Sequence, residues 1–199
     1  MYDVYACGRH DRWRFALGKS GERPLVAIGL NPNTATRDKG DVTATKVERV
    51  AARAGFDGFV LVNLYPVRAA RCAALPLREN RDAYATNLAQ IAECIERLAP
   101  AAIWAAWGAD VSRRDYFVRA AQALLAERTL ANAWWRFGPP TSAGHPRHPS
   151  RLRYAWSLVP FDPREYLGVL LGNAIRVTAA PLATGGHAPR RAQRDAVLP

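Results

Sequence analysis

Short apolar runs alternate along this chain with amphipathic segments, and the alternation predicts its fold. Buried central strands are indicated by three apolar runs that each end at a turn: residues 25–30, 58–65 and 101–107. Amphipathic helices are indicated where apolar side chains recur every three to four residues: residues 42–54, 79–98 and 112–127. Weaker patterns predict an edge strand at 11–17, a strand within 128–137, and a final strand or helix pair that ends near residue 175.

Strands that alternate with helices form a parallel sheet with both faces covered. We therefore expect an α/β fold with three αβα layers around a central, mostly parallel sheet of four to five strands. The 199 residues fit one domain, which we place at residues 1–177. Residues 178–199 are small, Pro- and Gly-containing and basic, and we expect a disordered tail there. That tail either adds non-specific affinity for an anion or does nothing.

The charge of the chain is strongly positive. Lys and Arg total 28 against 17 Asp and Glu, which gives a net charge of +11, and three of the cations are lysines. A balance this basic predicts a polyanionic partner such as nucleic acid. The alternative is a compositional bias that enriches Arg and Ala together. Such a bias explains the preference for Arg over Lys, but not the excess of cations over acids.

Several classes of function are disfavoured by what the chain lacks. Cys7, Cys72 and Cys94 form no CxxC pair, which disfavours a zinc site or an iron–sulfur cluster and suggests reduced thiols. We expect no metal and no cofactor, because no glycine-rich nucleotide motif and no GxSxG turn occur either. No apolar run approaches the ~20 residues of a membrane helix, and the first residues do not resemble a secretion signal. We expect a cytoplasmic protein with no membrane partner.

Polar side chains gather at the expected carboxyl ends of the strands, where open α/β sheets bind ligands. Asn31 follows the first central strand and Asn63 lies near the end of the second. Trp107 and Gly108 end the third, and His145 and His148 lie in the loop before the last elements. These strand ends are where we expect a site.

Each strand-end group has a structural and a functional interpretation. Asn31 either bonds its own backbone in a tight turn or orients a water molecule. Asn63 is either a satisfied core amide or a donor and acceptor pair that matches the edge of a pyrimidine. Residues 145–152, HPRHPSRL, form a rigid cationic loop, and loop residues often carry function.

Four motifs in order resemble the uracil-DNA glycosylase superfamily: GLNPNTA, VLVNLYPVRA, IWAAWGA and HPSRL. The chain is also similar to a family of bacterial proteins of unknown function. That family carries GLNPSTA, a downstream Asp-x-Thr and PRHP, which correspond here to residues 29–35, 41–43 and 146–149. This second resemblance spans about residues 11–155 and is the closer of the two.

The first resemblance implies a monofunctional DNA glycosylase. Such an enzyme hydrolyses the N-glycosidic bond of uracil in DNA and leaves an abasic site for base excision repair. Asn31 would position the attacking water, and His148 would donate a hydrogen bond to uracil O2 as the base leaves. Asn31 replaces a family Asp and cannot act as a general base, so Asp38 or Asp41 could supply a carboxylate instead.

The resemblance also implies binding residues. Asn63 would read the uracil edge, and its pocket would be lined by Gly29, Pro32, Asn33 and Trp107. Asn33 replaces the Tyr that excludes thymine in related enzymes, which leaves thymine rejection open. DNA contacts would come from five residues: Arg68, Arg147, Ser150, Arg151 and Leu152. Of these, Ser150 would touch a phosphate and Leu152 would fill the gap left by the flipped nucleotide.

Further candidates come from the residues themselves. Aromatic candidates for base stacking are Phe56, Tyr65, Trp107 and Trp135, and further cations for the DNA backbone are Arg71 and Arg153. We expect a monomer that binds DNA containing uracil. Two alternatives stay open: a non-catalytic protein that binds uracil-containing or single-stranded DNA on the same fold, and a hydrolase of free modified nucleotides. A compact pocket without a basic groove would favour the hydrolase.

Overall fold

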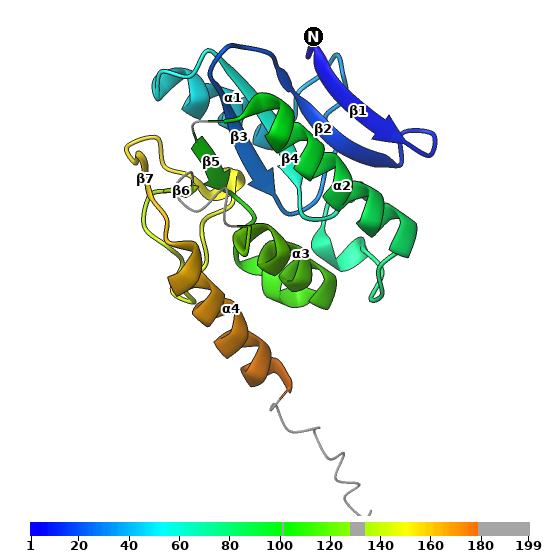
Figure 1. The fold of residues 1–199 in the computed structure, drawn as a ribbon, viewed down its shortest axis with the longest axis vertical. Helices are drawn as coiled ribbons and strands as arrows, with labels where there is room; N and C mark the ends of the chain where they lie inside the picture. The colour runs from blue at the N-terminus through cyan, green and yellow to red at the C-terminus, as the bar shows by residue number, and fades with distance from the viewer. Residues whose placement is uncertain (101, 128–133, 179–199) are drawn as a thin grey trace, which may run out of the picture.

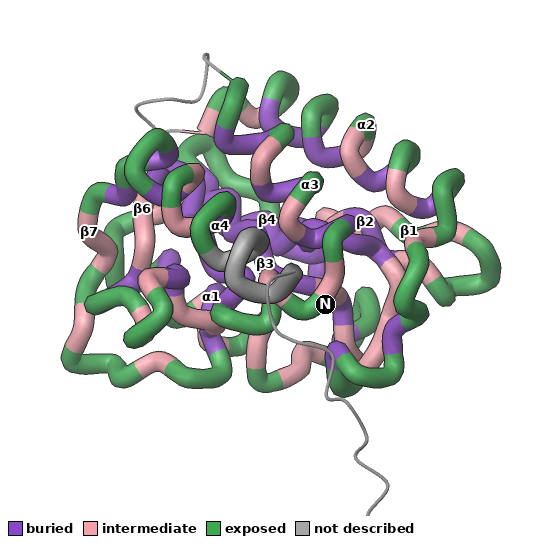
Figure 2. The backbone as a smooth tube through the Cα atoms, turned by 90° about the horizontal axis from the view of Figure 1, so that it is seen from below, coloured by how far each residue is buried: buried purple, intermediate pink, exposed green. Residues whose placement is uncertain are grey.

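The computed structural model describes residues 1–100, 102–127 and 134–178. One twisted sheet separates two helical layers (Figure 1). Viewed along the layers, helix α1 (Val42–Arg53) covers one face, and α2 (Arg81–Leu98) and α3 (Asp115–Leu125) cover the other (Figure 2). Helix α4 (Pro163–Thr178) packs beside α3. The α/β class and the layered arrangement agree with the prediction.

The sheet contains seven strands in the described part of the chain, in the order β1-β2-β4-β3-β5-β6-β7. Their bounds are Val4–Gly8, Trp13–Lys19, Pro24–Gly29, Gly58–Asn63, Ala102–Ala105, Trp134–Phe137 and Leu158–Pro160, from β1 to β7. The central pairs β4-β3, β3-β5 and β5-β6 are parallel. The outer pairs β1-β2, β2-β4 and β6-β7 are antiparallel.

The expectation of a mostly parallel sheet of four to five strands is therefore wrong. The prediction missed β1, because the turn that pairs it with β2 lacks the usual glycine. Arg9, His10 and Asp11 adopt left-handed backbones with φ of 47°, 54° and 64°, a conformation that favours glycine. It did not resolve β7, because three residues are too few to show an alternation.

The three predicted amphipathic helices are confirmed, with no end shifted by more than three residues. Asp41 begins α1 as its N-cap, accepting a hydrogen bond from the Ala44 N–H at 2.9 Å. Asn80 caps α2 in the same way through the Ala83 N–H at 2.9 Å. In the described residues, short 3₁₀ turns at Cys72–Ala74, Ala109–Arg113 and Pro149–Arg151 lie between the larger elements.

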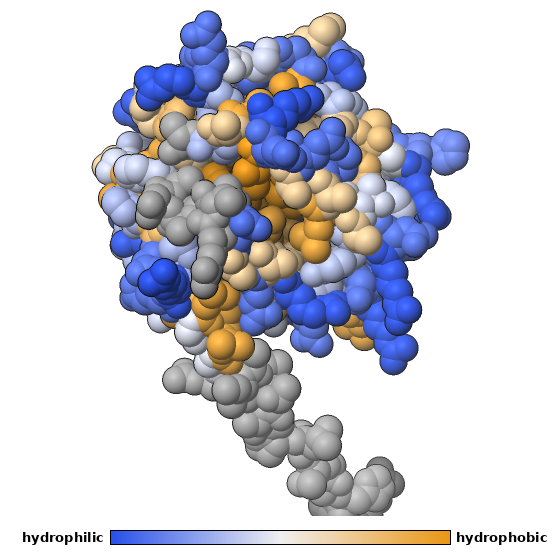
Figure 3. Space-filling model, viewed as in Figure 1, coloured by the Kyte–Doolittle hydropathy of each residue, from blue (hydrophilic) through white to orange (hydrophobic). Residues whose placement is uncertain are grey.

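Apolar cores fill both sides of the sheet. Strand β3 is buried along its whole length, which explains its unbroken apolar sequence. Val26 and Ile28 pack in the core under α2 and α3, while Leu25 and Ala27 pack in the core under α1. At the surface over α2 and α3, apolar side chains gather between the two helices and hydrophilic side chains surround them (Figure 3).

No helix in the described part of the chain is long and apolar enough to cross a membrane. The predicted tail lies almost wholly outside the described residues.

Candidate functional site

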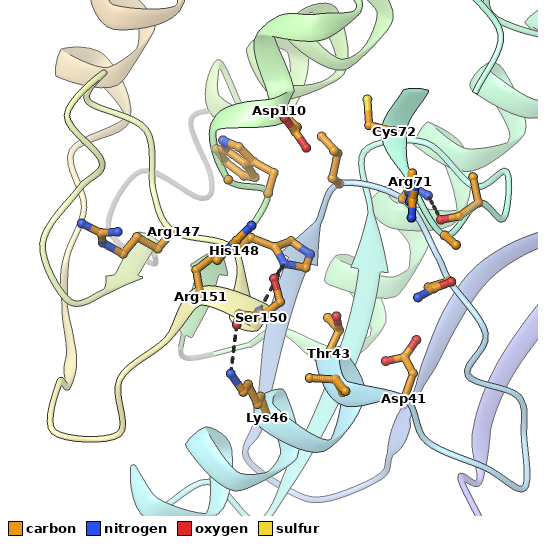
Figure 4. A pocket seen from close by; sticks show the side chains of 18 of the residues that line it. Asp41, Thr43, Lys46, Arg71, Cys72, Asp110, Arg147, His148, Ser150 and Arg151 are labelled. Carbon is orange, nitrogen blue, oxygen red and sulfur yellow. Dashed lines mark hydrogen bonds between the residues drawn. The ribbon is translucent and has the colours of Figure 1, made fainter. Parts of the chain in front are cut away.

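A cavity of about 1210 Å³ opens at the carboxyl ends of the parallel strands. Its wall comes from the loops that follow β3, β4, β5 and β6, together with the first two turns of α1. Figure 4 shows this cavity with the His148 ring projecting into it, Asp110 on one side, and Asp41 and Thr43 on the other. The cavity lies where the sequence predicts a site.

His148 is held in a defined tautomer. The Ser150 N–H donates to His148 Nδ1 at 3.2 Å, and the Ser150 hydroxyl lies 2.9 Å from the same nitrogen. A ring nitrogen that accepts a hydrogen bond from an N–H carries no proton, so this network assigns the proton of the neutral ring to Nε2. Nε2 has no hydrogen-bond partner in the described residues and is available to a ligand.

The charge state of His148 follows from its surroundings. Burial lowers the pKa of His148 to about 4, and the nearby Arg151 and Lys46 act in the same direction. Asp110 and Asp41 oppose this shift without cancelling it. His148 is therefore neutral at physiological pH and presents a hydrogen-bond donor to the cavity.

Gly108 supports the loop that carries His148. Its φ of 78° favours glycine, and a Cβ at this position would lie 2.8 Å from the Cβ of His148. The Trp107-Gly108 strand end thus gives the His148 loop its close approach to the end of β5.

Asn31 presents an acceptor to the cavity. Its Nδ2 donates to the backbone carbonyls of Pro32 at 3.0 Å and Ala69 at 2.9 Å. Both amide hydrogens are thereby engaged, while Oδ1 has no hydrogen-bond partner in the described residues. The structural interpretation is confirmed, because the Asn31 amide bonds the backbone of its own turn; the orientation of a water by its oxygen stays a prediction.

Asp41 lines the same cavity, but both of its oxygens are engaged. Oδ1 accepts from the Ala44 N–H as the cap of α1, and Oδ2 accepts from the Ala35 N–H at 3.2 Å. These bonds explain its position by structure alone. Asp38 is exposed and does not line the cavity.

Cations outnumber carboxylates in the cavity wall. Six cationic side chains line it, Lys46, Arg49, Arg71, Arg113, Arg147 and Arg151, against Asp41 and Asp110. Arg113 pairs with Asp110 at 2.6 Å. The side chains of Arg49, Arg71 and Arg151 make no ion pair or hydrogen bond with other described residues, so their charges are available to an anion. Lys46 and Arg49 were missed by sequence reasoning, although their place in the first turns of α1 follows from the Asp41 cap.

Arg147 turns away from the cavity centre (Figure 4). Its Nε donates to the Pro139 carbonyl at 2.9 Å and its Nη2 to the Pro140 carbonyl at 3.2 Å. Its guanidinium also lies over the Trp156 ring, 5.0 Å from the centroid. Arg151, from the same predicted set of DNA contacts, lies at the cavity wall and is exposed.

Arg68, a predicted DNA contact, is occupied within the protein instead. It lies outside the cavity wall, and all five of its N–H donors make hydrogen bonds to other residues. They reach the carbonyls of Asn33 and Ala35 at 2.8 Å each, the carbonyl and carboxylate of Asp11 at 2.8 and 3.0 Å, and the Tyr5 hydroxyl at 2.8 Å. Arg68 ties the cavity loop to the β1–β2 turn.

Arg14 lies beneath the same loop and was missed by sequence reasoning. It is 1% exposed, and its Nη1 donates to the Ala35 carbonyl at 3.2 Å. Burial lowers its pKa to about 10, with Asp41 opposing the shift. Because Arg14 occupies a polar position in a strand of alternating polar and apolar residues, the sequence predicts an exposed side chain there rather than a buried one.

Three predicted pocket residues lie beneath the cavity rather than in its wall. Asn63 is buried at the end of β4, and its Nδ2 has no hydrogen-bond partner in the described residues. Its Oδ1 lies against Gly29, where a Cβ would approach it to 2.7 Å. Pro32 is also buried. Asn33 does line the cavity, as expected.

The predicted aromatic and wedge residues are buried or partly buried against the two cores. Trp107 touches the cavity but is 1% exposed, and its Nε1 donates to the Tyr166 hydroxyl at 2.9 Å. Leu152 is partly buried and packs against the core under α1. Tyr65 is buried in the core under α2 and α3, while Phe56 and Trp135 are partly buried and pack against the core under α1.

His145 belongs to a buried polar network behind the cavity. Its Nδ1 lies 2.8 Å from the Tyr166 hydroxyl and its Nε2 3.2 Å from the Ser112 hydroxyl. The Trp107 indole donates to the same Tyr166 oxygen, which completes the network. Burial lowers the pKa of His145. His145 thus joins α4 to the loop that precedes His148.

The described residues contain no group of three or more His, Cys, Asp or Glu side chains placed as metal ligands. Cys72 lines the cavity as a free thiol whose pKa is raised by burial.

Comparison with known proteins places the chain in a family without identifying its activity. No curated protein matches the sequence. A family model described as a protein of unknown function, DUF1643, matches residues 12–150. This range covers most of the chain and includes the loops that carry Asn31, Asp41 and His148. The chain belongs to the DUF1643 family.

Proposed function

We propose that the protein is a DNA glycosylase that hydrolyses the N-glycosidic bond of uracil and leaves an abasic site. The observation that carries the proposal is the neutral His148 ring, whose Nε2–H faces a cavity with an excess of cations. The order of motifs that resembles the uracil-DNA glycosylase superfamily agrees with it. The uracil-DNA glycosylase-like arrangement of the fold belongs to the same proposal.

The reaction needs an anion to be stabilised as the base leaves. The bond between sugar C1′ and uracil N1 breaks, and its electron pair passes to the base, with charge shared by uracil O2. His148 Nε2–H donates to that oxygen, and the hydrogen bond strengthens as the charge develops. Loss of one such donor costs about 100- to 1000-fold in rate.

The second requirement is a placed water molecule. The water oxygen attacks C1′ and its proton passes to solvent, while the released uracil anion takes up a proton from solvent, so that water supplies the hydroxyl of the abasic sugar. The free Oδ1 of Asn31 would accept a hydrogen bond from this water and orient it. Asn31 is the better candidate than Asp41, because both Asp41 oxygens already bind backbone N–H groups.

The remaining cavity charges would bind phosphates. The side chains of Arg49, Arg71 and Arg151 have no partner in the described residues, and all three residues line the wall. The basic wall favours a polynucleotide over a free nucleotide, since one nucleotide has few charges to meet these cations. The reading of the uracil edge by Asn63 stays a prediction. Its unpartnered Nδ2 would gain a partner if a base carbonyl reached it.

The test is a base-release assay with purified protein and a labelled single-stranded oligonucleotide that holds one uracil. Alkali then cleaves the strand at any abasic site. We expect cleavage at the uracil by the wild type and at least a 100-fold slower reaction for His148→Ala. The matched control is His10→Asn, which changes an exposed histidine in the β1–β2 turn and should keep the wild-type rate.

No release of uracil by the wild type, with the oligonucleotide still bound, would replace the proposal by a non-catalytic binding protein. Equal rates for the wild type and folded His148→Ala would remove His148 from the mechanism.

A further inference from the structure

We propose that a groove beside the cavity, formed by α1 and the segment around Tyr154, binds a single DNA strand on one side of the target nucleotide. We call it the α1 groove and define it by Lys46, Arg49, Ala52, Arg53, Arg151 and Tyr154. The inference deepens the proposed function, because it assigns single-stranded DNA as the substrate class.

The groove continues directly from the cavity. A second hollow of about 240 Å³ is lined by Arg49, Ala52, Arg53 and Tyr154. Arg49 and Tyr154 line both this hollow and the cavity. A strand with one nucleotide in the cavity would therefore enter the α1 groove without crossing a barrier of other elements.

The charges of the groove follow the helix. Lys46, Arg49 and Arg53 are spaced three and four residues apart, which places them on one face of α1. They extend over about 10 Å at ~1.5 Å per residue. A stacked strand carries one phosphate every ~3.4 Å, so three cations can face about three successive phosphates. Among the described residues, no carboxylate lines the second hollow.

Tyr154 supplies an exposed aromatic surface within this row of charges. It is 37% exposed, and its ring lies 5.6 Å from the Arg53 guanidinium. Arg53 Nη1 also donates to the Tyr154 carbonyl at 3.5 Å. Alternation of cations with an aromatic face is the pattern of proteins that bind single strands by backbone charge and base stacking.

The walls of the groove are held together before any ligand binds. Lys46 Nζ donates to the Ser150 carbonyl at 3.1 Å, which joins the second turn of α1 to the His148 loop. Tyr154 is joined to the last turn of α1 through Arg53. A preformed groove reduces the ordering that binding would otherwise require.

A single strand fits this surface better than a duplex. Enzymes that act on a base in a duplex must unstack it, and commonly fill the gap with a side chain. Leu152, which the sequence suggests for that task, packs instead against the core under α1. A base in a single strand needs no such replacement.

The test measures binding of fluorescein-labelled dT₁₀, which contains no uracil, by fluorescence anisotropy over a range of salt concentrations. The variant Arg49→Gln/Arg53→Gln removes two groove charges. Its matched control is Arg81→Gln/Arg97→Gln, two exposed arginines on α2, across the sheet from α1. Thermal unfolding of each protein checks that the fold is kept.

We expect the groove variant to bind dT₁₀ about tenfold more weakly at low salt. The slope of log affinity against log salt should fall by about 1.4, at ~0.7 per phosphate contact on a single strand. The control should match the wild type. Tyr154→Ala should weaken binding at least about fivefold with the slope unchanged, because stacking carries no counterion.

The proposal would be overturned if the groove variant bound dT₁₀ with the affinity and salt slope of the wild type. It would also be overturned if the α2 control lost as much affinity for dT₁₀ as the groove variant. Tighter binding of a ten-base-pair duplex than of dT₁₀ would overturn the single-strand assignment, and tighter binding of rU₁₀ would overturn the DNA assignment. Because dT₁₀ contains no uracil, these results do not depend on base release. Weaker binding by the groove variant together with no uracil release would support the groove and refute the glycosylase.

Discussion

Acid should destabilise this protein through His148, by an amount that can be worked out from the structure. Burial lowers the pKa of His148 from 6.5 to about 4 in the folded state. Between these two values the unfolded chain binds a proton that the folded protein does not. The free energy of unfolding therefore falls as the pH falls from above 6.5 towards 4. At pH 4.5 the loss from this one group is about 2.5 kcal/mol.

The assay is urea denaturation at a series of pH values from 7.5 to 4.5, followed by fluorescence of the buried tryptophans. The variant is His148→Asn, whose side-chain oxygen can still accept the Ser150 N–H. Other groups titrate in both proteins, including His145, whose pKa is also lowered by burial. Taking the difference between wild type and variant removes their contribution. We expect the wild type to lose about 2.5 kcal/mol more than the variant between the two ends of the range.

His10→Asn is the control, since His10 is exposed in the β1–β2 turn and should leave the wild-type pH dependence unchanged. Parallel curves for the wild type and His148→Asn would refute the reasoning. That result would mean that the folded protein accepts a proton on His148 as readily as the unfolded chain, and that the ring is not held neutral against the cavity.

Two further predictions concern the backbone around the site. Gly108→Ala and Gly55→Ala both place a side chain at a φ near +80°, but only the first brings it against His148. Gly55→Ala should lower the free energy of unfolding by about 1 kcal/mol and keep the wild-type rate of uracil release. Gly108→Ala should lower it by a similar amount and also slow uracil release at least about tenfold. Equal rates of uracil release in the two variants would contradict this prediction. Arg68→Lys should lower the free energy of unfolding by about 2 kcal/mol in urea denaturation, because three ammonium donors cannot replace five. The exposed Arg12→Lys serves as its control, and an equal change in both would show that the Arg68 bonds carry no stability.

The sequence predicted most reliably the parts of the fold that are buried on both sides. Strands β3 and β4 are enclosed between two layers, so nearly every position is apolar and the run stands out. Strand β1 belongs to a hairpin at the edge, where its residues are only partly buried. Its turn adopts left-handed backbones at non-glycine residues, so neither alternation nor turn chemistry marked it.

For the site, the residues after the strands were easier to place than those within them. Asn31 and His148 follow strand ends and lie at the cavity, as the topology of a parallel sheet requires. Asn63 is still part of β4, where the alternation of side chains turns it towards the core. The sequence of a loop arginine does not show whether backbone carbonyls surround it. Arg68 could therefore not be distinguished from a cation that faces a ligand.

The edge strands of the sheet, β1 and β7, affect whether the sheet can pair with strands of other protein molecules in solution. An outer strand with unpaired backbone N–H and C=O groups can pair with a strand of another chain, and proteins commonly carry features on such strands that prevent this pairing. The ladder of β1 is interrupted by a register shift between Ala6 and Cys7. Strand β7 has three residues and ends at Pro160, which has no N–H to donate. Both rims thus offer poor templates for continuing the sheet, which protects the protein from edge-to-edge aggregation.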